Sequence, residues 1–224
     1  MGDDDAAVTT HVAAPAARVR SLAGSLRKRT FDVALVVVTL PLTLPVGVLL
    51  GLAVRATSRG PAIFRQERVG RGGRPFRMYK FRTMVVDAEE RLARDPELHA
   101  LYVRNDHKIP AKLDPRVTRL GRFLRVTSLD ELPQLINVVD GSMSLVGPRP
   151  ITKPQYDEVE PLLDAYRAAR PGMTGYWQVT GRSLIPYPER AEYDAHYVRN
   201  WSLHRDLVIL LQTPLAVVRK RGAV

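Results

Sequence analysis

A short acidic motif near the middle of the chain has the residue types that can carry out group transfer. Asp130 and Glu131 are adjacent, and Ser128 lies just before them. Ser128 and Glu131 have the spacing of a capping box, which predicts that a helix begins at Ser128 with both carboxylates in its first turn. Peptide dipoles at a helix start favour an ionised carboxylate, which can bind Mg2+ or act as a nucleophile. A helix that only caps itself would show the same pattern.

Basic residues flank this motif in the sequence. Four arginines precede it at three-residue intervals, with apolar residues between them, and we expect them on one broad face of a helix. They are Arg116, Arg119, Arg122 and Arg125. After the motif, Arg149 lies between Pro148 and Pro150, which restrict its backbone. Such arginines suit phosphates or anionic headgroups, although a solvated basic face and a rigid turn would explain the same residues.

The charge balance also predicts an anionic partner. The 224 residues include 34 lysines and arginines against 23 aspartates and glutamates, a formal net charge of +11. Aromatic residues make up only 7% of the chain, which disfavours a nucleic-acid partner because such proteins use aromatic side chains to stack bases. The chain has no cysteine, which excludes thiolate chemistry. Catalysis would therefore depend mainly on carboxylates, assisted by lysine and arginine.

An uncharged apolar stretch at residues 33–54 predicts a membrane element. As a continuous helix its 22 residues would reach roughly 33 Å, enough to cross a bilayer core of about 30 Å. Pro41 and Pro45 interrupt it, and basic residues flank both ends. Because basic flanks favour the cytoplasmic side, we expect both ends on that side, which makes a re-entrant hairpin bent at the prolines. A full span is the alternative.

The other patterns predict an α+β fold, mostly helical with a small β-sheet, attached to the membrane by the re-entrant helix and by interfacial amphipathic helices. We expect a hairpin of strands at residues 62–69 and 75–82 around a glycine-rich turn. The apolar residues 207–218 are too few to span but suit a helix that lies at the interface or covers the core. Further helices are predicted at 87–105, 154–169 and 189–198, and strands at 143–146 and 176–179. We divide the chain into a flexible tail (1–27), a membrane helix (28–57) and a cytoplasmic catalytic domain (58–224).

Five ordered motifs resemble those of the bacterial sugar transferase family. This family comprises the monotopic polyprenyl-phosphate phosphoglycosyl transferases that begin exopolysaccharide, O-antigen and glycan assembly. The motifs occupy residues 80–84, 114–121, 127–135, 143–150 and 170–175. The resemblance runs from about Lys28 to the C-terminus, and the chain resembles the minimal catalytic-core form of the family.

The resemblance implies a two-step reaction. Asp130 would attack the β-phosphate of a UDP-sugar, releasing UMP and leaving a phosphosugar on the carboxylate. Polyprenyl (undecaprenyl) phosphate would then take the phosphosugar. Mg2+ would be held at Asp130 and Glu131, where Glu131 is either a metal ligand or a general base. The enzyme would act on the cytoplasmic face of the bacterial inner membrane.

The resemblance also implies a set of residues near the substrate phosphates. By motif position they are Lys80, Arg82, Arg125, Arg149, Arg182, Asp194 and Asp206. The long segment between Met84 and Asp114, with Trp177 and Trp201, is most similar to members that transfer hexose 1-phosphate. It favours UDP-galactose or UDP-glucose as the donor.

Two other functions fit part of the sequence. A non-catalytic membrane protein that binds anionic lipid would explain the charge and the apolar stretch, but it gives Asp130 and Glu131 no purpose. A hydrolase could use the same carboxylates and would release free sugar phosphate when no lipid acceptor is present. A homo-oligomer is compatible with the sequence, which contains no signal for or against one.

Overall fold

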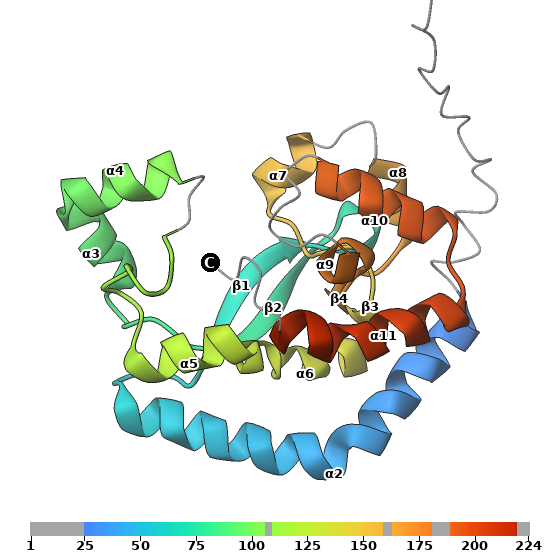
Figure 1. Cartoon of the computed structure of the whole chain (residues 1–224), viewed down its shortest axis with the longest axis horizontal. Helices are drawn as coiled ribbons and strands as arrows, with labels where there is room; N and C mark the ends of the chain where they lie inside the picture. The colour runs from blue at the N-terminus through green and yellow to red at the C-terminus, as the bar shows by residue number, and fades with distance from the viewer. Residues whose placement is uncertain (1–24, 106–108, 159–162, 181–188, 219–224) are drawn as a thin grey trace, which may run out of the picture.

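A long helix, α2 (Leu26–Thr57), lies along one side of the domain in the computed structural model (Figure 1), which describes residues 25–105, 109–158, 163–180 and 189–218. The Ser25 side chain caps its start by accepting a hydrogen bond from the Lys28 amide at 3.2 Å. The helix has 32 residues and runs through both Pro41 and Pro45. It bends near its middle, the part that contains these prolines (Figure 1).

Both ends of α2 are bonded to the rest of the domain. Near its start, the Arg29 guanidinium donates to the main-chain carbonyls of Val138 and Val139 in α6 (Gln134–Asp140). Just beyond its end, the Arg82 guanidinium donates to the Ser58 carbonyl at 2.9 Å. A straight helix of this length would measure about 48 Å. The bend therefore brings two distant ends of one apolar helix onto the same body.

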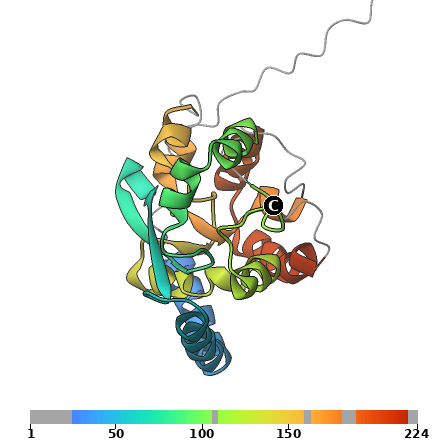
Figure 2. The ribbon, with the colours of Figure 1, turned by 90° about the vertical axis from the view of Figure 1, so that its left-hand side faces the viewer.

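The middle of α2 is largely exposed and apolar. Of the residues that the structure describes, those of α2 form the one helix long and apolar enough to cross a membrane by length and composition. Its exposed large apolar side chains include Val37, Val38, Leu40, Leu42, Leu44, Val48, Leu49 and Leu52. In Figure 2, α2 is viewed nearly along its axis and projects below the domain. These features confirm an apolar helix suited to a membrane at the predicted position.

The predicted hairpin is present. Strand β1 (Ile63–Val69) pairs antiparallel with β2 (Pro75–Phe81), and η1 (Arg71–Gly73) forms the turn between them. Gly72 and Gly73 have positive φ in this turn, a conformation that glycine adopts at little cost. In the register Phe64 is opposite Lys80. The hairpin therefore presents Lys80 near the end of β2.

The helices predicted between the hairpin and the acidic motif are present, but one of them is divided into two. Residues 87–105 form α3 (Ala88–Arg94) and α4 (Pro96–Arg104) rather than one helix. Asp95 separates them because its side chain accepts a hydrogen bond from the Leu98 amide and starts α4, with Pro96 at the first helical position. Helix α5 (Arg119–Thr127) follows, and Thr118 caps it through the Gly121 amide.

A second small sheet is present, and one of the predicted strands is instead a helix. Strand β3 (Ser144–Val146) is buried as predicted and pairs in parallel with β4 (Gly172–Thr174). The predicted strand at 176–179 is wrong, because these residues belong to helix α9 (Tyr176–Thr180). The extended chain ends at Thr174, and the Gln178 amide bonds back to the Gly175 carbonyl at 3.1 Å, which starts a helical turn. The predicted helix at 154–169 is seen as α7 (Lys153–Glu158) and α8 (Leu163–Ala168), and residues 159–162 lie outside the described residues.

The last two helices close the core. Helices α10 (Glu189–Arg199) and α11 (Leu203–Val218) confirm the predicted helical and apolar segments. The largest core cluster joins α2, β2, α6, β3, α8, α10 and α11. Figure 1 shows α5, α6 and α11 in one layer beside α2. The fold is α+β and mostly helical, as the sequence predicts.

Candidate active site

The acidic pair lies on a short 3-10 turn, and the predicted capping box is wrong. Ser128 ends α5 in the left-handed conformation (φ 58°), and it is the one non-glycine residue with positive φ in the part of the chain that the structure describes. Asp130 and Glu131 follow in η2 (Leu129–Glu131), and α6 begins only after Pro133. Because Pro133 has no amide hydrogen, a continuous helix from Ser128 would lack a hydrogen bond at its first full turn. Strained backbone of this kind is common at functional sites.

Lys80 meets both carboxylates. Its Nζ lies 2.8 Å from Glu131 Oε1 and 4.0 Å from Asp130 Oδ2. The Asp130 side chain is 13% exposed and that of Glu131 is 26% exposed, so both are largely withdrawn from water yet still reachable. Lys80 is thus the direct charge partner of Glu131, and Asp130 is left with a weaker contact.

Asn137 fixes the position of this turn relative to the hairpin. Its Oδ1 accepts from the Tyr79 amide and its Nδ2 donates to the Arg77 carbonyl, each at 2.9 Å. The Asn137 side chain therefore forms hydrogen bonds with main-chain groups of β2, as a neighbouring strand would. Since Asn137 lies in α6 and Lys80 follows Tyr79 directly, these two bonds set Lys80 opposite the acidic pair.

A glycine allows α5 to approach the end of β2. A Cβ on Gly121 would lie 2.0 Å from the Thr83 carbonyl oxygen, a severe clash with backbone. The Thr118 amide donates to the same carbonyl at 3.0 Å. From this position in α5, Arg125 Nε donates to Thr83 Oγ1 at 2.9 Å. The close approach thus brings Arg125 to the segment that follows Lys80 and β2.

The two carboxylates have different electrostatic environments. Burial raises the pKa of Asp130 to about 6, the Glu131 charge adds to the rise, and the charges of Lys80 and Arg125 oppose it. Burial acts in the same direction on Glu131, but the charges of Lys80 and Arg149 outweigh it and lower the pKa of Glu131. Environments that move the pKa values of two neighbouring acids apart are typical of sites where each acid has its own role.

Three predicted cations therefore surround the acidic pair: Lys80 by direct contact, Arg125 through its charge on Asp130, and Arg149 through its charge on Glu131. One further neighbour of the pair, Gln134, is not predicted by the motifs. Gln134 is buried, and its side chain donates a hydrogen bond to Glu131 that lowers the pKa of this acid. Gln134 lies within the motif at residues 127–135, and this position could have marked it as a site residue.

Asp194 supports the Arg149 turn. Its Oδ2 accepts from the Arg149 amide at 3.1 Å and from the Tyr166 hydroxyl at 3.0 Å, and its side chain is buried. Burial raises the pKa of Asp194 to about 7 against these two hydrogen bonds. The structure thus places Asp194 beneath a phosphate-binding candidate, and its own predicted contact with phosphate stays a prediction.

Two other predicted arginines have partners away from the acidic pair. Arg82 is buried and bonds to Ser58 and to the Arg59 carbonyl at 2.5 Å, where it closes the end of α2. Arg116 precedes α5 and forms a buried ion pair with Asp114 at 2.8 Å, so the expected helical face of four arginines does not include it. Arg182 lies outside the described residues.

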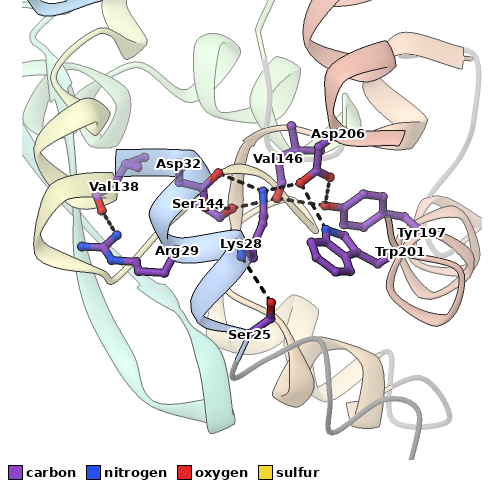
Figure 3. A network of polar contacts seen from close by, with 10 residues as sticks. All are labelled: Ser25, Lys28, Arg29, Asp32, Val138, Ser144, Val146, Tyr197, Trp201 and Asp206. Atoms are coloured by element: carbon purple, nitrogen blue, oxygen red, sulfur yellow. Dashed lines mark hydrogen bonds and ion pairs between the residues drawn. The ribbon is translucent and has the colours of Figure 1, made fainter. Parts of the chain in front are cut away.

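Asp206 belongs to a buried network at the start of α2 (Figure 3). Lys28 Nζ lies 2.7 Å from Asp206 and 2.9 Å from Asp32. Tyr197 and Trp201 donate to Asp206 at 2.6 and 3.1 Å, and Ser144 donates to Asp32 at 2.6 Å. This arrangement ties α2 to β3, α10 and α11. The predicted contact of Asp206 with phosphate stays a prediction.

Lys28 and Asp32 were missed as structural residues. Their signal was present in the sequence, because opposite charges four residues apart lie on one face of a helix and Asp32 directly precedes the apolar stretch.

The acidic pair could hold a divalent cation only with help from a substrate. Among the described residues there is no group of three or more His, Cys, Asp or Glu side chains placed to hold a metal. Mg2+ is commonly bound by one or two carboxylates together with substrate phosphates. Asp130 and Glu131 fit that mode, with Lys80 sharing the Glu131 carboxylate.

The fold and the site define an α+β protein with a long, exposed apolar helix and an acidic pair among cations. A family model described as bacterial sugar transferase matches residues 23–220. The chain belongs to this family, as its motifs predicted.

Curated relatives are similar over most of this chain. The undecaprenyl-phosphate galactose phosphotransferase of Salmonella typhimurium is 46% identical over 200 residues, which are 88% of this chain and 41% of that protein. The exopolysaccharide production protein ExoY of Rhizobium meliloti is 39% identical over 204 residues, 89% of each chain. The UDP-glucose:undecaprenyl-phosphate glucose-1-phosphate transferase of Escherichia coli K12 is 38% identical over 196 residues, 84% of this chain and 39% of that protein. The chain thus spans about two fifths of the Salmonella and Escherichia relatives and most of ExoY.

Proposed function

We propose that this chain is a phosphoglycosyl transferase that moves hexose 1-phosphate from a UDP-hexose to undecaprenyl phosphate. The observation that carries the proposal is Asp130, a largely buried carboxylate held 4.0 Å from Lys80 within the family's characteristic motif. The names of the relatives supply the substrate class, since they specify undecaprenyl phosphate with galactose or glucose.

In the first step an Asp130 oxygen attacks the β-phosphorus of the donor. The bond from that phosphorus to the bridging oxygen breaks, and the electron pair leaves on UMP. Lys80, Arg125 and Arg149 offset the negative charge of the phosphates, which in water would repel the carboxylate. In the second step an oxygen of the lipid phosphate attacks the same phosphorus and frees Asp130. The partly buried site limits the access of water to the acyl phosphate.

Mg2+ would be held by Asp130 and Glu131 and would neutralise diphosphate charge when bound. Because Lys80 already contacts Glu131 at 2.8 Å, this acid stays ionised beside its neighbour. We therefore propose that Glu131 holds the cations, Mg2+ and Lys80, that neutralise the charge of the diphosphate. Asp130, whose pKa is raised to about 6 by burial, is the less strongly paired of the two and the better placed to react.

The acceptor is a membrane lipid, and the surface near the site suits a membrane. Exposed apolar side chains occur on each of the three helices that lie beside α2; they are Phe123 of α5, Ile136 and Val139 of α6, and Leu203, Leu207, Leu211, Leu215 and Val218 of α11. We infer that these helices rest in the interface and that α2 enters the membrane as a re-entrant element. Attachment of both ends of α2 to one body supports this, as does its bend (Figure 1). The domain would then lie on the cytoplasmic face of the inner membrane.

The deciding experiment is transfer of radiolabelled hexose phosphate from UDP-galactose and UDP-glucose to undecaprenyl phosphate. We expect wild type to form labelled lipid with at least one donor and Asp130→Asn to lose at least about a thousandfold in rate, since it removes the nucleophile. Asp157→Asn, at an exposed carboxylate of α7, is the matched control and should retain full rate.

Mass spectrometry after incubation with donor alone should show hexose phosphate attached to Asp130. Equal, trace-level product from wild type and Asp130→Asn would instead support the non-catalytic lipid-binding alternative. Free sugar phosphate in the absence of lipid, formed at the rate of turnover, would support the hydrolase.

A further inference from the structure

Arg68 is a half-buried arginine of the hairpin with an unused donor. It lies on β1, where its Nη2 donates to Gln66 Oε1 at 2.8 Å. Its Nε is buried and has no hydrogen-bond partner within the described structure. A buried donor without an acceptor is costly, so an acceptor supplied from outside the chain would relieve that cost.

The strand register places Arg68 on the same face of the hairpin as Lys80. Phe64 is opposite Lys80 and Arg68 is opposite Phe76. Because side chains alternate along a strand and directly opposed residues share a face, Phe64, Arg68 and Lys80 lie on one face. Arg68 and Phe64 are four residues apart, which places Arg68 about 13 Å along the hairpin from the Lys80 position.

Arg149 is close enough to both Arg68 and Glu131 for its charge to act on each. The Val69 amide, next to Arg68, donates to the Ile151 carbonyl at 2.9 Å and holds the Arg149 turn against β1. Burial lowers the pKa of Arg68 to about 10, and the charge of Arg149 adds to this lowering. Two neighbouring guanidinium groups, one of them with a buried donor that has no partner in the described structure, are suited to bind an anion.

We propose that Arg68 and Arg149 together bind the α-phosphate of the UDP-sugar, the phosphate that departs on UMP. This inference rests on the proposed function and adds a residue, Arg68, to its donor site. When the bond between the β-phosphorus and the bridging oxygen breaks, the electron pair goes to that oxygen and UMP gains a negative charge. Arg68 Nε–H and the Arg149 guanidinium donate to the phosphate oxygens that carry this charge, and no proton transfer is required.

The position of Arg68 agrees with this role. Lys80 contacts the carboxylate that would attack, so it marks the place of the β-phosphate. The leaving group departs on the side of that phosphorus away from the nucleophile. Arg68 lies about 13 Å along the hairpin from the Lys80 position, which suits the leaving phosphate rather than the one attacked.

Calorimetry of UMP binding to the full chain in detergent tests the inference. Arg68→Gln should weaken UMP binding by at least about tenfold, the usual scale for a charge-assisted hydrogen bond to phosphate. The matched control is Arg65→Gln on the same strand. It loses the same charge on the opposite face, where Arg65 lies over the Tyr79 ring, and should bind UMP as wild type does. In turnover, Arg68→Gln should leave the KM for undecaprenyl phosphate unchanged. A general structural defect would change this KM.

The outcomes separate this inference from the function on which it rests. If wild type binds UMP and forms labelled lipid while Arg68→Gln binds UMP equally well, the inference is wrong and the proposed function stands. If wild type neither binds UMP nor forms labelled lipid, both fail. Should Arg68→Gln prove unfolded by circular dichroism, Arg68→Lys decides. One ammonium cannot reproduce the guanidinium fork, so weaker UMP binding than wild type supports the inference and equal binding overturns it.

Discussion

At the residue scale, the two adjacent acids of the site, Asp130 and Glu131, differ in how closely they contact Lys80. Glu131 takes the direct contact with Lys80, and Asp130 keeps a buried carboxylate 4.0 Å from the same ammonium. A carboxylate whose pKa is raised is a stronger base and nucleophile once ionised, and here the raised value still lies below neutral pH. On the proposed mechanism, the arrangement therefore keeps Asp130 ionised near pH 7 and able to act as the nucleophile.

The rate should depend on pH through Asp130. Its pKa is raised to about 6, so it is mostly ionised above pH 7 and mostly protonated below pH 5. We expect kcat/KM for the UDP-sugar to fall about tenfold per pH unit below pH 6. In Lys80→Gln the acidic limb should move to higher pH, because the Lys80 charge lowers the pKa of Asp130. A limb that stays in place in Lys80→Gln would contradict this account of Asp130.

At the element scale, α2 is attached to the domain through charges rather than through its apolar residues alone. Lys28 is buried between Asp32 of its own helix and Asp206 of α11 (Figure 3). One cation serves two buried carboxylates, and burial raises the pKa of Asp206 although Lys28, Tyr197 and Trp201 oppose the rise. The attachment is therefore sensitive to the loss of the single cation.

Lys28→Met should destabilise the protein strongly. It leaves two buried carboxylates without a cation, and breaking a buried ion pair from one side costs about 3–5 kcal/mol. Asp206→Asn should cost less, because Lys28 keeps Asp32 at 2.9 Å. The free energy of unfolding in detergent, measured for both variants, tests this order, with Arg27→Met at the exposed neighbouring residue as control. Equal stability of Lys28→Met and Arg27→Met would show that the network contributes nothing.

The exposed leucines of α11 should matter for membrane binding and not for folding. They recur every four residues along one stripe of the helix, and Leu207 is 48% and Leu211 71% exposed. Changing both to glutamate should weaken binding to anionic vesicles by at least about tenfold, since each leucine contributes on the order of 1.5 kcal/mol or more when buried in lipid. Vesicle sedimentation measures this. Leu113→Glu, at an equally exposed leucine outside α11, is the control, and a similar loss in it would contradict the role of the stripe.

At the scale of the whole molecule, the domain and α2 form one unit, because α2 packs against the domain near both of its ends. Val54 near the end of α2 packs with Phe81 and Leu124, while Val36 near its start belongs to the main core. A helix that spanned the bilayer would have to give up one of these two contacts. The folded domain itself therefore favours a re-entrant arrangement.

Cysteine labelling in intact cells tests this topology. The chain has no native cysteine, so single substitutions can be interpreted directly. We expect Leu26→Cys and Pro61→Cys, both at exposed positions outside the apolar stretch, to be protected from a membrane-impermeant thiol reagent and to react once the cells are permeabilised. Reaction of only one of them in intact cells would indicate a full span.

The sequence alone determined the parts of this protein whose structure follows from local pattern. The apolar helix with its prolines, the glycine-turned hairpin and the amphipathic helices depend on periodicity and on neighbouring residues, and each lies where predicted. The local pattern gave the wrong prediction at Ser128, because Pro133 has no amide hydrogen to continue a helix that starts there. It was also wrong at 176–179, where the residues predicted to form a strand form helix α9.

Only the tertiary structure decided which charges meet the acidic pair. Lys80 and Glu131 are 51 residues apart in sequence, and they are joined because Asn137 holds β2 beside α6. Arg82, two residues after Lys80, points instead to the end of α2, and Asp206 is enclosed by Lys28, Tyr197 and Trp201. The physical reason is that a charge is satisfied by whichever group the packing of distant elements brings within a few ångströms, and sequence spacing does not encode that distance.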